Sequence, residues 1–236
     1  MKTIYLVRHA AAAKGKPKSP DRKRALNKNG RKEAMKMAKK LKKNGMLPDL
    51  LVSSPAKRAL QTARVFARAI KYPKDKILLS KILYEANNAS SNEALLEDVR
   101  SLDDQFQSVM VFGHDPLLME FAHYLRKDFT DALPGCAVVR FDFNNISWTK
   151  IAAGRGILKF FDYPNMEKAQ LDEKKKALTA RLTEDLMRIF VEADPDTGPK
   201  MKKAIKKTVR PLTQNFLAKT KTKAKARETP QEPVAE

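Results

Sequence analysis

The stretch Ile4-Tyr5-Leu6-Val7-Arg8-His9-Ala10 lies only a few residues from the amino terminus and decides the expected fold. Residues 3–7 form a short apolar and partly β-branched run, which is typical of one buried strand and too short for a helix. The run stops at Arg8 and His9, where a permanently charged guanidinium lies beside an imidazole. In open α/β sheets, ligands collect beyond the carboxyl ends of the strands. We therefore predict that Arg8 and His9 belong to a ligand site.

The same order of elements recurs further along the chain. Residues 50–53 (LLVS) predict a second strand, and the following helix carries Arg58 in its first turn. Residues 109–112 (VMVF) predict another strand, which leads directly into Gly113-His114-Asp115-Pro116 and a further helix. Strands that alternate with helices predict a three-layer α/β/α sandwich with a mostly parallel central sheet.

Hydrophobic periodicity predicts the remaining elements. We expect further strands at 77–79, 137–143, 148–152 and 157–161, and helices at 31–43, 55–70, 92–102, 117–126 and 166–191. Asn27 or Asn29 could cap the helix at 31–43, and the last three strands would form a meander.

The composition limits the class of protein. The chain has 236 residues, of which 42% are hydrophobic and 32% are charged. One cysteine, Cys136, excludes an internal disulfide and fits a reducing compartment. No apolar run approaches the length of a membrane span, so we expect a soluble, cytoplasmic protein. The net charge of +21 favours polyanionic partners, although a basic surface that serves only solubility would look the same.

The character of the chain changes at Pro164, which predicts three regions. Residues 1–164 carry the strand and helix pattern, and residues 165–199 form a helical extension with a leucine stripe from Leu171 to Ile189. We expect this stripe to pack on the first region or on a second copy. Residues 200–236 form a basic helix or tail, partly disordered, with eleven Lys or Arg and no acid between Lys200 and Arg227. We expect a flexible arm that binds acidic protein or nucleic acid.

Four side chains follow the predicted strands at the edge where an α/β fold would collect them, namely Arg8, His9, Arg58 and His114. Two guanidinium groups would repel a cation, so the set is poor for a metal, and we expect neither a metal nor a cofactor. Guanidinium forks match phosphate oxygens, and the amino end of the Arg58 helix adds its dipole. One histidine could attack phosphorus while the other donates to a phosphoryl oxygen, which would give covalent phosphoryl transfer.

Three motifs in this order resemble the signatures of the histidine phosphatase superfamily, which has the phosphoglycerate mutase-like fold. They are residues 6–10 (LVRHA), 53–63 (SSPAKRALQTA) and 112–116 (FGHDP). The likeness covers roughly residues 1–164 and is strongest to the small SixA-like phosphohistidine phosphatases. Residues 21–30 are similar to that group's Arg-x-Leu segment, which implies Arg24 as a further phosphate ligand.

The resemblance implies a role for each residue. His9 would be the nucleophile and would become phosphohistidine, so it must be neutral, with its other ring nitrogen donating to a backbone carbonyl. Arg8, Arg58 and His114 would hold the phosphoryl group, and Glu85 lies where the superfamily carries its proton donor. Ala10 stands where mutase-like members have glycine and then glutamate, and the His9-to-His114 span is short, which argues for an open site and against a mutase.

The resemblance therefore implies a metal-independent phosphatase, in the first place one that acts on protein phosphohistidine in bacterial signalling. Two alternatives stay open. The chain could be a small-molecule phosphomonoesterase of the same superfamily, or a regulatory module that only binds phosphorylated partners and gains affinity from its basic tail. The oligomeric state does not follow from the sequence.

Overall fold

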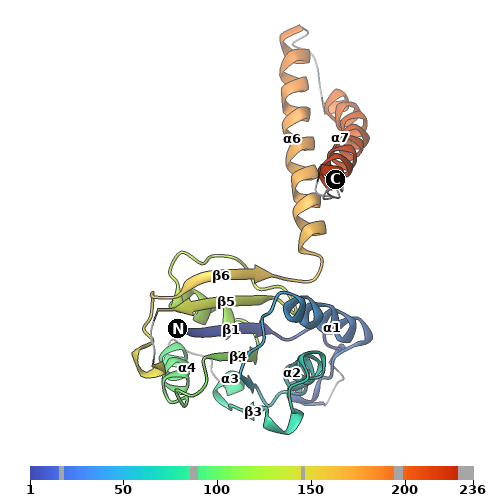
Figure 1. Ribbon diagram of the computed structural model, residues 1–236. Helices are drawn as coiled ribbons and strands as arrows, with labels where there is room; N and C mark the ends of the chain where they lie inside the picture. Colours follow the sequence, from blue (N-terminus) through green and yellow to red (C-terminus); the bar gives the residue numbers. More distant parts are fainter. Residues whose placement is uncertain (16–18, 86–89, 145–146, 194–198, 228–236) are drawn as a thin grey trace, which may run out of the picture. The chain divides into compact units, whose positions relative to one another are not determined.

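The protein is described here by a computed structural model that covers residues 1–15, 19–85, 90–144, 147–193 and 199–227 (Figure 1). The chain divides into two compact units, Met1–Pro164 and Asn165–Glu236. The described helices include no segment that is both long enough and apolar enough to cross a membrane.

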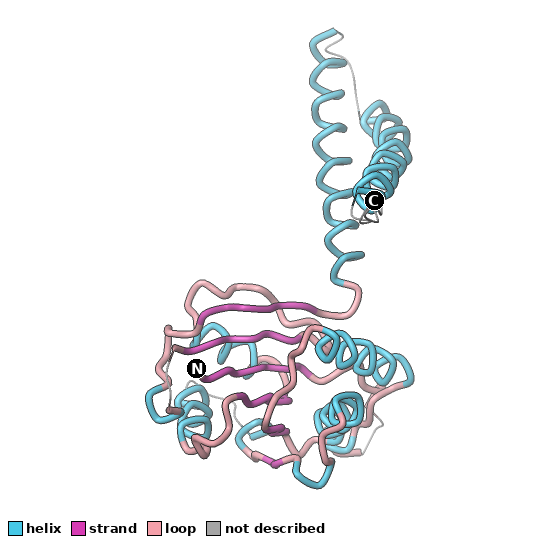
Figure 2. The backbone as a smooth tube through the Cα atoms, in the orientation of Figure 1, coloured by secondary structure: helices cyan, strands magenta, loops and turns pink. Residues whose placement is uncertain are grey.

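A six-stranded sheet is the centre of the N-terminal unit (Figure 2). Its strands follow the order β3-β2-β4-β1-β5-β6, in which β1, β2, β3 and β4 run parallel and β5 and β6 are antiparallel to their neighbours. The strands are β1 (Lys2–Arg8), β2 (Leu50–Ser53), β3 (Leu78–Leu79), β4 (Ser108–Gly113), β5 (Val138–Phe143) and β6 (Ile157–Asp162).

Helices cover both faces of this sheet, which confirms the predicted α/β architecture. They are α1 (Lys28–Lys43), α2 (Lys57–Ile70), α3 (Ile82–Glu85), α4 (Ser90–Arg100) and α5 (Leu117–Leu125), with 3₁₀ turns η1 (Asp21–Lys23), η2 (Lys74–Lys76) and η3 (Trp148–Lys150). The N-cap of α1 is Asn27, whose Oδ1 accepts a hydrogen bond from the Gly30 backbone N–H at 2.7 Å.

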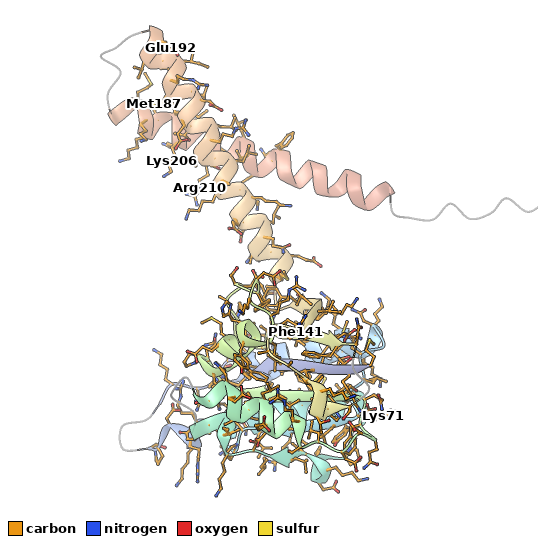
Figure 3. The ribbon with its side chains drawn as sticks, turned by 90° about the vertical axis from the view of Figure 1, so that its left-hand side faces the viewer. Lys71, Phe141, Met187, Glu192, Lys206 and Arg210 are labelled. Carbon is orange, nitrogen blue, oxygen red and sulfur yellow. The ribbon has the colours of Figure 1, made fainter. Side chains whose placement is uncertain are left out.

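Strand β1 shows why its apolar run is continuous. Ile4 and Leu6 pack into the core formed with α4 and α5, which also contains Phe141, labelled in Figure 3. Tyr5 and Val7 pack into the opposite core, formed with α1 and α2. Because successive side chains of a strand point to opposite faces, a segment such as residues 4–7 that is buried in both cores is apolar at successive positions.

The register of the central strands decides where the site lies. Strands β1 and β4 pair in parallel with Arg8 opposite Gly113, so the residues that follow each strand emerge side by side. The His9 backbone N–H donates to the Gly113 carbonyl at 3.0 Å, and the Ser54 N–H donates to the Phe112 carbonyl at 2.9 Å. The ends of β1, β2 and β4 therefore meet at one edge of the sheet.

The predicted strand at 148–152 is wrong. Its first part is the 3₁₀ turn η3, with Ser147 as N-cap. Trp148 is fully buried, and its indole Nε1–H donates to the Phe106 carbonyl at 2.9 Å. A buried indole N–H needs one hydrogen-bond acceptor, and here the acceptor is a loop carbonyl, so Trp148 does not have to lie in a strand.

The C-terminal unit consists of α6 (Met166–Ala193) and α7 (Pro199–Arg227), which pack on each other. Leu182 and Ile189 of the leucine stripe are 37% and 58% exposed, and the packing of the stripe on the first region or on a second copy stays a prediction. The buried α6 residues are instead Thr179 and Thr183. Each threonine hydroxyl bonds to a carbonyl one turn earlier in its own helix, and this allows polar side chains to be buried.

The expected flexible arm is also wrong for Pro199–Arg227, which is helical. Ile205, Val209 and Thr213 of α7 are buried. They recur every four residues and so form one buried face of a helix whose other positions are mostly basic or polar. The expectation of disorder for residues 228–236 lies outside the described residues.

Candidate active site

His9 lies directly after β1 and has both ring nitrogens engaged. Its Nδ1 lies 2.8 Å from the carbonyl oxygen of Ala10, and its Nε2 lies 3.1 Å from Nε of Arg58. A carbonyl only accepts and a guanidinium only donates, so the proton belongs on Nδ1 and the lone pair on Nε2. The Ala10 carbonyl is the backbone acceptor expected from the sequence. Nε2 is thus the nitrogen available for attack.

His114 follows β4 and lies beside His9, with ring centroids 5.0 Å apart. Its Nε2 is 2.9 Å from the Ser54 hydroxyl, which also accepts from the Ala56 backbone N–H. Tyr84 of α3 lies edge-on to the His114 ring, with centroids 5.8 Å apart. The Nδ1 atom of His114 is buried and has no hydrogen-bond partner among the described residues.

Both imidazoles are held neutral. Burial, together with the positive charges of Arg58, Arg8 and Arg24, lowers the pKa of His9 to about 4, although the bond to the Ala10 carbonyl opposes this shift. Burial, and next the charge of Arg58, lower the pKa of His114 to about 3. A free imidazole titrates near 6.5, so both rings lack a positive charge at neutral pH.

This depression of the His9 pKa predicts how its ring titrates. We expect ¹⁵N NMR of the imidazole nitrogens to show His9 still neutral at pH 5.5, because its pKa is lowered from the ordinary 6.5 to about 4. The pKa is lowered because burial and the neighbouring positive charges both disfavour the imidazolium. A midpoint near 6.5 would contradict the buried, arginine-flanked environment and would leave the nucleophile half protonated in mild acid.

Two arginines flank the histidines. Arg58 is only 8% exposed and comes from the first turn of α2, whose backbone N–H groups point toward the same edge. Arg8 donates to the Leu133 carbonyl at 2.5 Å and pairs with Asp115 at 2.9 Å. Burial raises the pKa of the Asp115 carboxyl, and the Arg8 charge opposes that rise. The structure thus brings together Arg8, His9, Arg58 and His114.

The carboxylate of Asp21 joins the guanidinium groups of Arg24 and Arg58. Its oxygens lie 2.8 Å from Arg24 and 2.8 Å from Arg58, and Arg58 also donates to the Asp21 backbone carbonyl at 3.0 Å. The hydrogen bond from Arg24, followed by the charge and hydrogen bond of Arg58, lowers the pKa of Asp21. An ionised carboxylate therefore occupies guanidinium positions that a phosphate could take.

We expect replacement of Asp21 by asparagine to tighten binding of inorganic phosphate by up to about fivefold, measured as competitive inhibition. The Asp21 side chain is 51% exposed, and exposed ion pairs contribute about 0.2–1 kcal/mol, which sets this range. Asp75→Asn is the matched control, because it removes an equal charge from an exposed 3₁₀ turn outside the site. Weaker phosphate binding in Asp21→Asn would show that this carboxylate orients Arg58 rather than competing for it.

Close packing supports the loop after His9. The Ala10 backbone N–H donates to the Thr62 hydroxyl of α2 at 3.1 Å, and that hydroxyl in turn donates to the Arg58 carbonyl at 2.8 Å. Gly30 lies against this loop so tightly that a Cβ there would be 2.1 Å from the Ala11 carbonyl oxygen. Glycine is therefore required at this position.

Not every predicted residue can be placed. Arg24 reaches the site through Asp21, whereas the side chain of Glu85, at the end of α3, lies outside the described residues. Ser54, Asp21, Thr62 and Tyr84 also belong to the site, although no motif marks them individually. Ser54 and Thr62 lie within residues 53–63 and Asp21 lies within residues 21–30, but their partners are distant in sequence, and only the fold shows those contacts.

The described residues contain no group of three or more His, Cys, Asp or Glu side chains that could hold a metal ion. Cys136 is fully buried, and burial raises the pKa of its thiol above the ordinary value. A buried, protonated thiol is unreactive, so the chemistry of this edge rests on imidazole and guanidinium groups.

Residues 4–105 match the sequence profile of the histidine phosphatase superfamily (branch 1). This match contains His9, Arg24 and Arg58, and the structure adds His114 from β4 to the same edge. Over these residues the N-terminal unit is similar to the histidine phosphatase superfamily, and the match supports a phosphatase. Among curated proteins, no sequence matches the chain significantly.

Solved structures share the fold. A candidate phosphohistidine phosphatase SixA from Agrobacterium tumefaciens is 27% identical with a TM-score of 0.58, covering 69% of this chain and 98% of that one. The protein histidine phosphatase SixA complexed with tungstate is 21% identical with a TM-score of 0.57, covering 69% and 97%. A mycobacterial glucosyl-3-phosphoglycerate phosphatase is 14% identical with a TM-score of 0.52, covering 67% and 97%. The last two likenesses concern the fold alone.

Proposed function

We propose that this chain hydrolyses phosphohistidine on proteins by passing the phosphoryl group through His9. The observation that carries the proposal is the state of the His9 ring, which is neutral and keeps its lone pair on Nε2, where it accepts a hydrogen bond from Arg58. An imidazole in this state can attack phosphorus without first losing a proton.

The reaction has two displacements. First, Nε2 of His9 forms a bond to phosphorus while the bond from phosphorus to the substrate imidazole breaks, and that imidazole takes up a proton. Second, a water oxygen attacks phosphorus, the bond to His9 Nε2 breaks, and inorganic phosphate leaves with the water proton transferred to solvent or to an adjacent base. No electrons are exchanged with a redox partner, and the guanidinium groups supply the positive charge that a metal would otherwise bring.

The neighbouring residues take the supporting roles. Arg8, Arg24 and Arg58 bind phosphoryl oxygens through their forks, once the phosphoryl group replaces the Asp21 carboxylate. The free Nδ1 of His114 is the ring nitrogen that we assign to a phosphoryl oxygen, because Ser54 already holds Nε2. Glu85, at the end of the helix that places Tyr84 on His114, is our proposed proton donor to the leaving group.

Two observations support a protein substrate. The candidate SixA from Agrobacterium tumefaciens is covered along 98% of its length, so this N-terminal unit has the size of that small protein. Between β2 and β4, the described chain contains only α2, η2, β3, α3 and α4, which leaves the edge of the sheet without an added cap domain. An uncapped edge admits a side chain that is presented on another protein.

A substrate panel tests the proposal. We expect kcat/KM for a phosphohistidine protein to exceed that for a phosphoserine peptide and for p-nitrophenyl phosphate by about 100-fold. An imidazole leaves more readily than an alkoxide, so Glu85→Gln should reduce turnover of the serine ester far more than turnover of phosphohistidine. A preference for the small phosphoester would overturn the protein substrate and favour a small-molecule phosphomonoesterase.

A further inference from the structure

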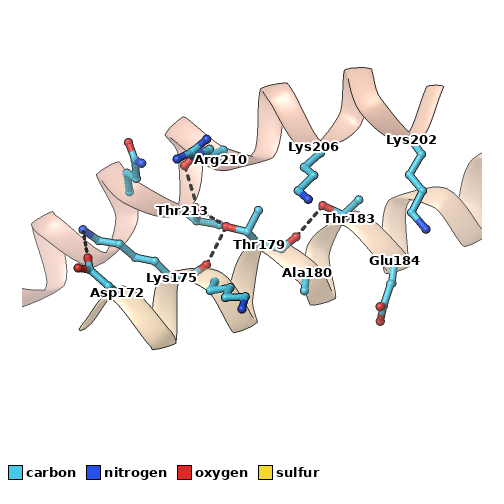
Figure 4. Close-up of a pocket in the computed structure, with 12 residues that line it drawn as sticks. Asp172, Lys175, Thr179, Ala180, Thr183, Glu184, Lys202, Lys206, Arg210 and Thr213 are labelled. Atoms are coloured by element: carbon cyan, nitrogen blue, oxygen red, sulfur yellow. Dashed lines mark hydrogen bonds and ion pairs between the residues drawn. The ribbon is translucent and has the colours of Figure 1, made fainter. Parts of the chain in front are cut away.

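Helices α6 and α7 enclose a groove of about 670 Å³ within the C-terminal unit (Figure 4). Its α6 side runs from Asp172 to Glu184, and its α7 side runs from Lys202 to Gln214. This groove shares no residue with the site at His9, so it needs a separate explanation.

The floor of the groove consists of buried threonines. Thr179 and Thr213 join the two helices through their hydroxyls at 2.9 Å, and Thr183 bonds to the Thr179 carbonyl at 2.6 Å. Thr213 also lies 2.9 Å from the Arg210 carbonyl. Each of these hydroxyl groups donates its proton to a carbonyl of the protein, so the floor offers no hydrogen-bond donor to a ligand.

The walls of the groove are strongly basic. Two carboxylates line it, those of Asp172 and Glu184. The cationic side chains number five: Lys175, Lys176, Lys202, Lys206 and Arg210. Within the described part of the chain, Lys175 is the one groove cation within 4 Å of a carboxylate, at 3.7 Å from Asp172. The other groove cations have no carboxylate within 4 Å among the described residues, so an anion between the helices would be attracted to several positive charges at once.

The cations of α7 form a row. Lys202, Lys206 and Arg210 recur every four residues, so they follow one face of the helix with about 6 Å of rise between neighbours. Figure 4 shows Lys206 directed toward Thr183, across the space between the two helices. A row of this kind matches a ligand that repeats a negative charge along its length.

We propose that this groove binds inorganic polyphosphate, a linear chain of phosphate groups. The free polar groups of the walls are mainly N–H donors, so the fitting ligand is one that consists of acceptors and carries no donors of its own. A peptide would bring backbone N–H groups, which need acceptors, whereas the charged groups of the lining are five cations and only two carboxylates. A single-stranded nucleic acid would bring bases, yet none of the described lining residues is aromatic and could stack on them.

Two double variants of the full chain test this site. Lys202→Gln with Lys206→Gln removes two groove cations, whereas Lys203→Gln with Lys207→Gln removes two exposed lysines of the same helix that do not line the groove. Residue type, spacing and net charge change are the same in both. Each protein is titrated with fluorescently labelled polyphosphate, with an oligothymidylate of equal phosphate number and with polyglutamate, at several salt concentrations.

We expect the groove variant to bind polyphosphate at least about tenfold more weakly, with a reduced salt dependence, and the control variant to lose less than about threefold. Equal losses in the two variants would overturn the groove and leave only a diffuse basic surface. Oligothymidylate or polyglutamate binding as tightly as polyphosphate, with the same response to the groove variant, would overturn the ligand class. The result does not depend on the phosphatase proposal, because binding alone is measured and the groove lies outside that site.

Discussion

Replacement of His9 by alanine is expected to lower turnover of any phosphorylated substrate by several thousandfold or more, as deletion of the attacking group does in other covalent enzymes. The variant removes the Nε2 lone pair that faces Arg58, and no other described nitrogen of this edge has the same environment. Rapid acid-free quenching followed by mass spectrometry should find base-stable, acid-labile phosphate on His9 of the unaltered protein and none on the variant.

His123→Ala is the matched control for this experiment. The third histidine of the chain is exposed on α5, and its Nδ1 lies 3.4 Å from the Phe129 carbonyl, away from the site. We expect the control to keep its turnover and its phosphoenzyme. Undiminished activity in His9→Ala would refute the covalent mechanism altogether.

Replacement of Arg58 by alanine is the change with the second largest expected effect. It removes the donor to His9 Nε2 together with a cation that we assign to the phosphoryl group. Loss of one such donor costs about 2.7–4 kcal/mol in transition-state stabilisation, so kcat should fall about 10²- to 10³-fold. Steady-state kinetics on a small phosphoester measures this loss.

The controls separate charge from packing. Arg64→Ala removes an exposed arginine of the same helix and should leave kcat unchanged. Arg58→Lys keeps the charge but lacks the planar fork, so it should recover only part of the loss. Thermal unfolding of each variant shows whether the alanine also destabilises the fold, since Arg58 is nearly buried. A normal kcat in folded Arg58→Ala would exclude this side chain from the chemistry.

The central strands and the histidines were predictable because their signals are local. A continuous apolar run marks a strand buried on both faces, and the polar residue after it must lie at the edge of the sheet. Arg8, His9 and His114 follow from that rule, and Arg58 follows from its place in the first turn of α2. The parallel pairing of β1 with β4 then decides that the two histidines are neighbours.

Contacts between distant segments could not be predicted in this way. The ion pair between Asp21 and Arg58 joins a loop to a helix 37 residues further along the chain, and the bond between Ser54 and His114 spans 60 residues. The burial of Thr179 and Thr183 could not be predicted from hydrophobic periodicity, because threonine counts as polar even when its hydroxyl is bonded within its own helix. Such partners become visible only when the backbone has brought them together.

The Asp21 carboxylate has a consequence for which phosphorus compounds the enzyme accepts. A ligand must replace a singly charged group that already lies between Arg24 and Arg58. A terminal phosphoryl group, which carries close to two negative charges at neutral pH, gains attraction in that exchange. A phosphodiester carries one negative charge, the same as the carboxylate that it would replace, and it adds a second substituent. Its attraction to Arg24 and Arg58 is therefore no stronger than that of Asp21. Competition with Asp21 would therefore favour binding of phosphomonoesters and terminal phosphoryl groups over binding of the phosphodiesters in nucleic acids and phospholipids.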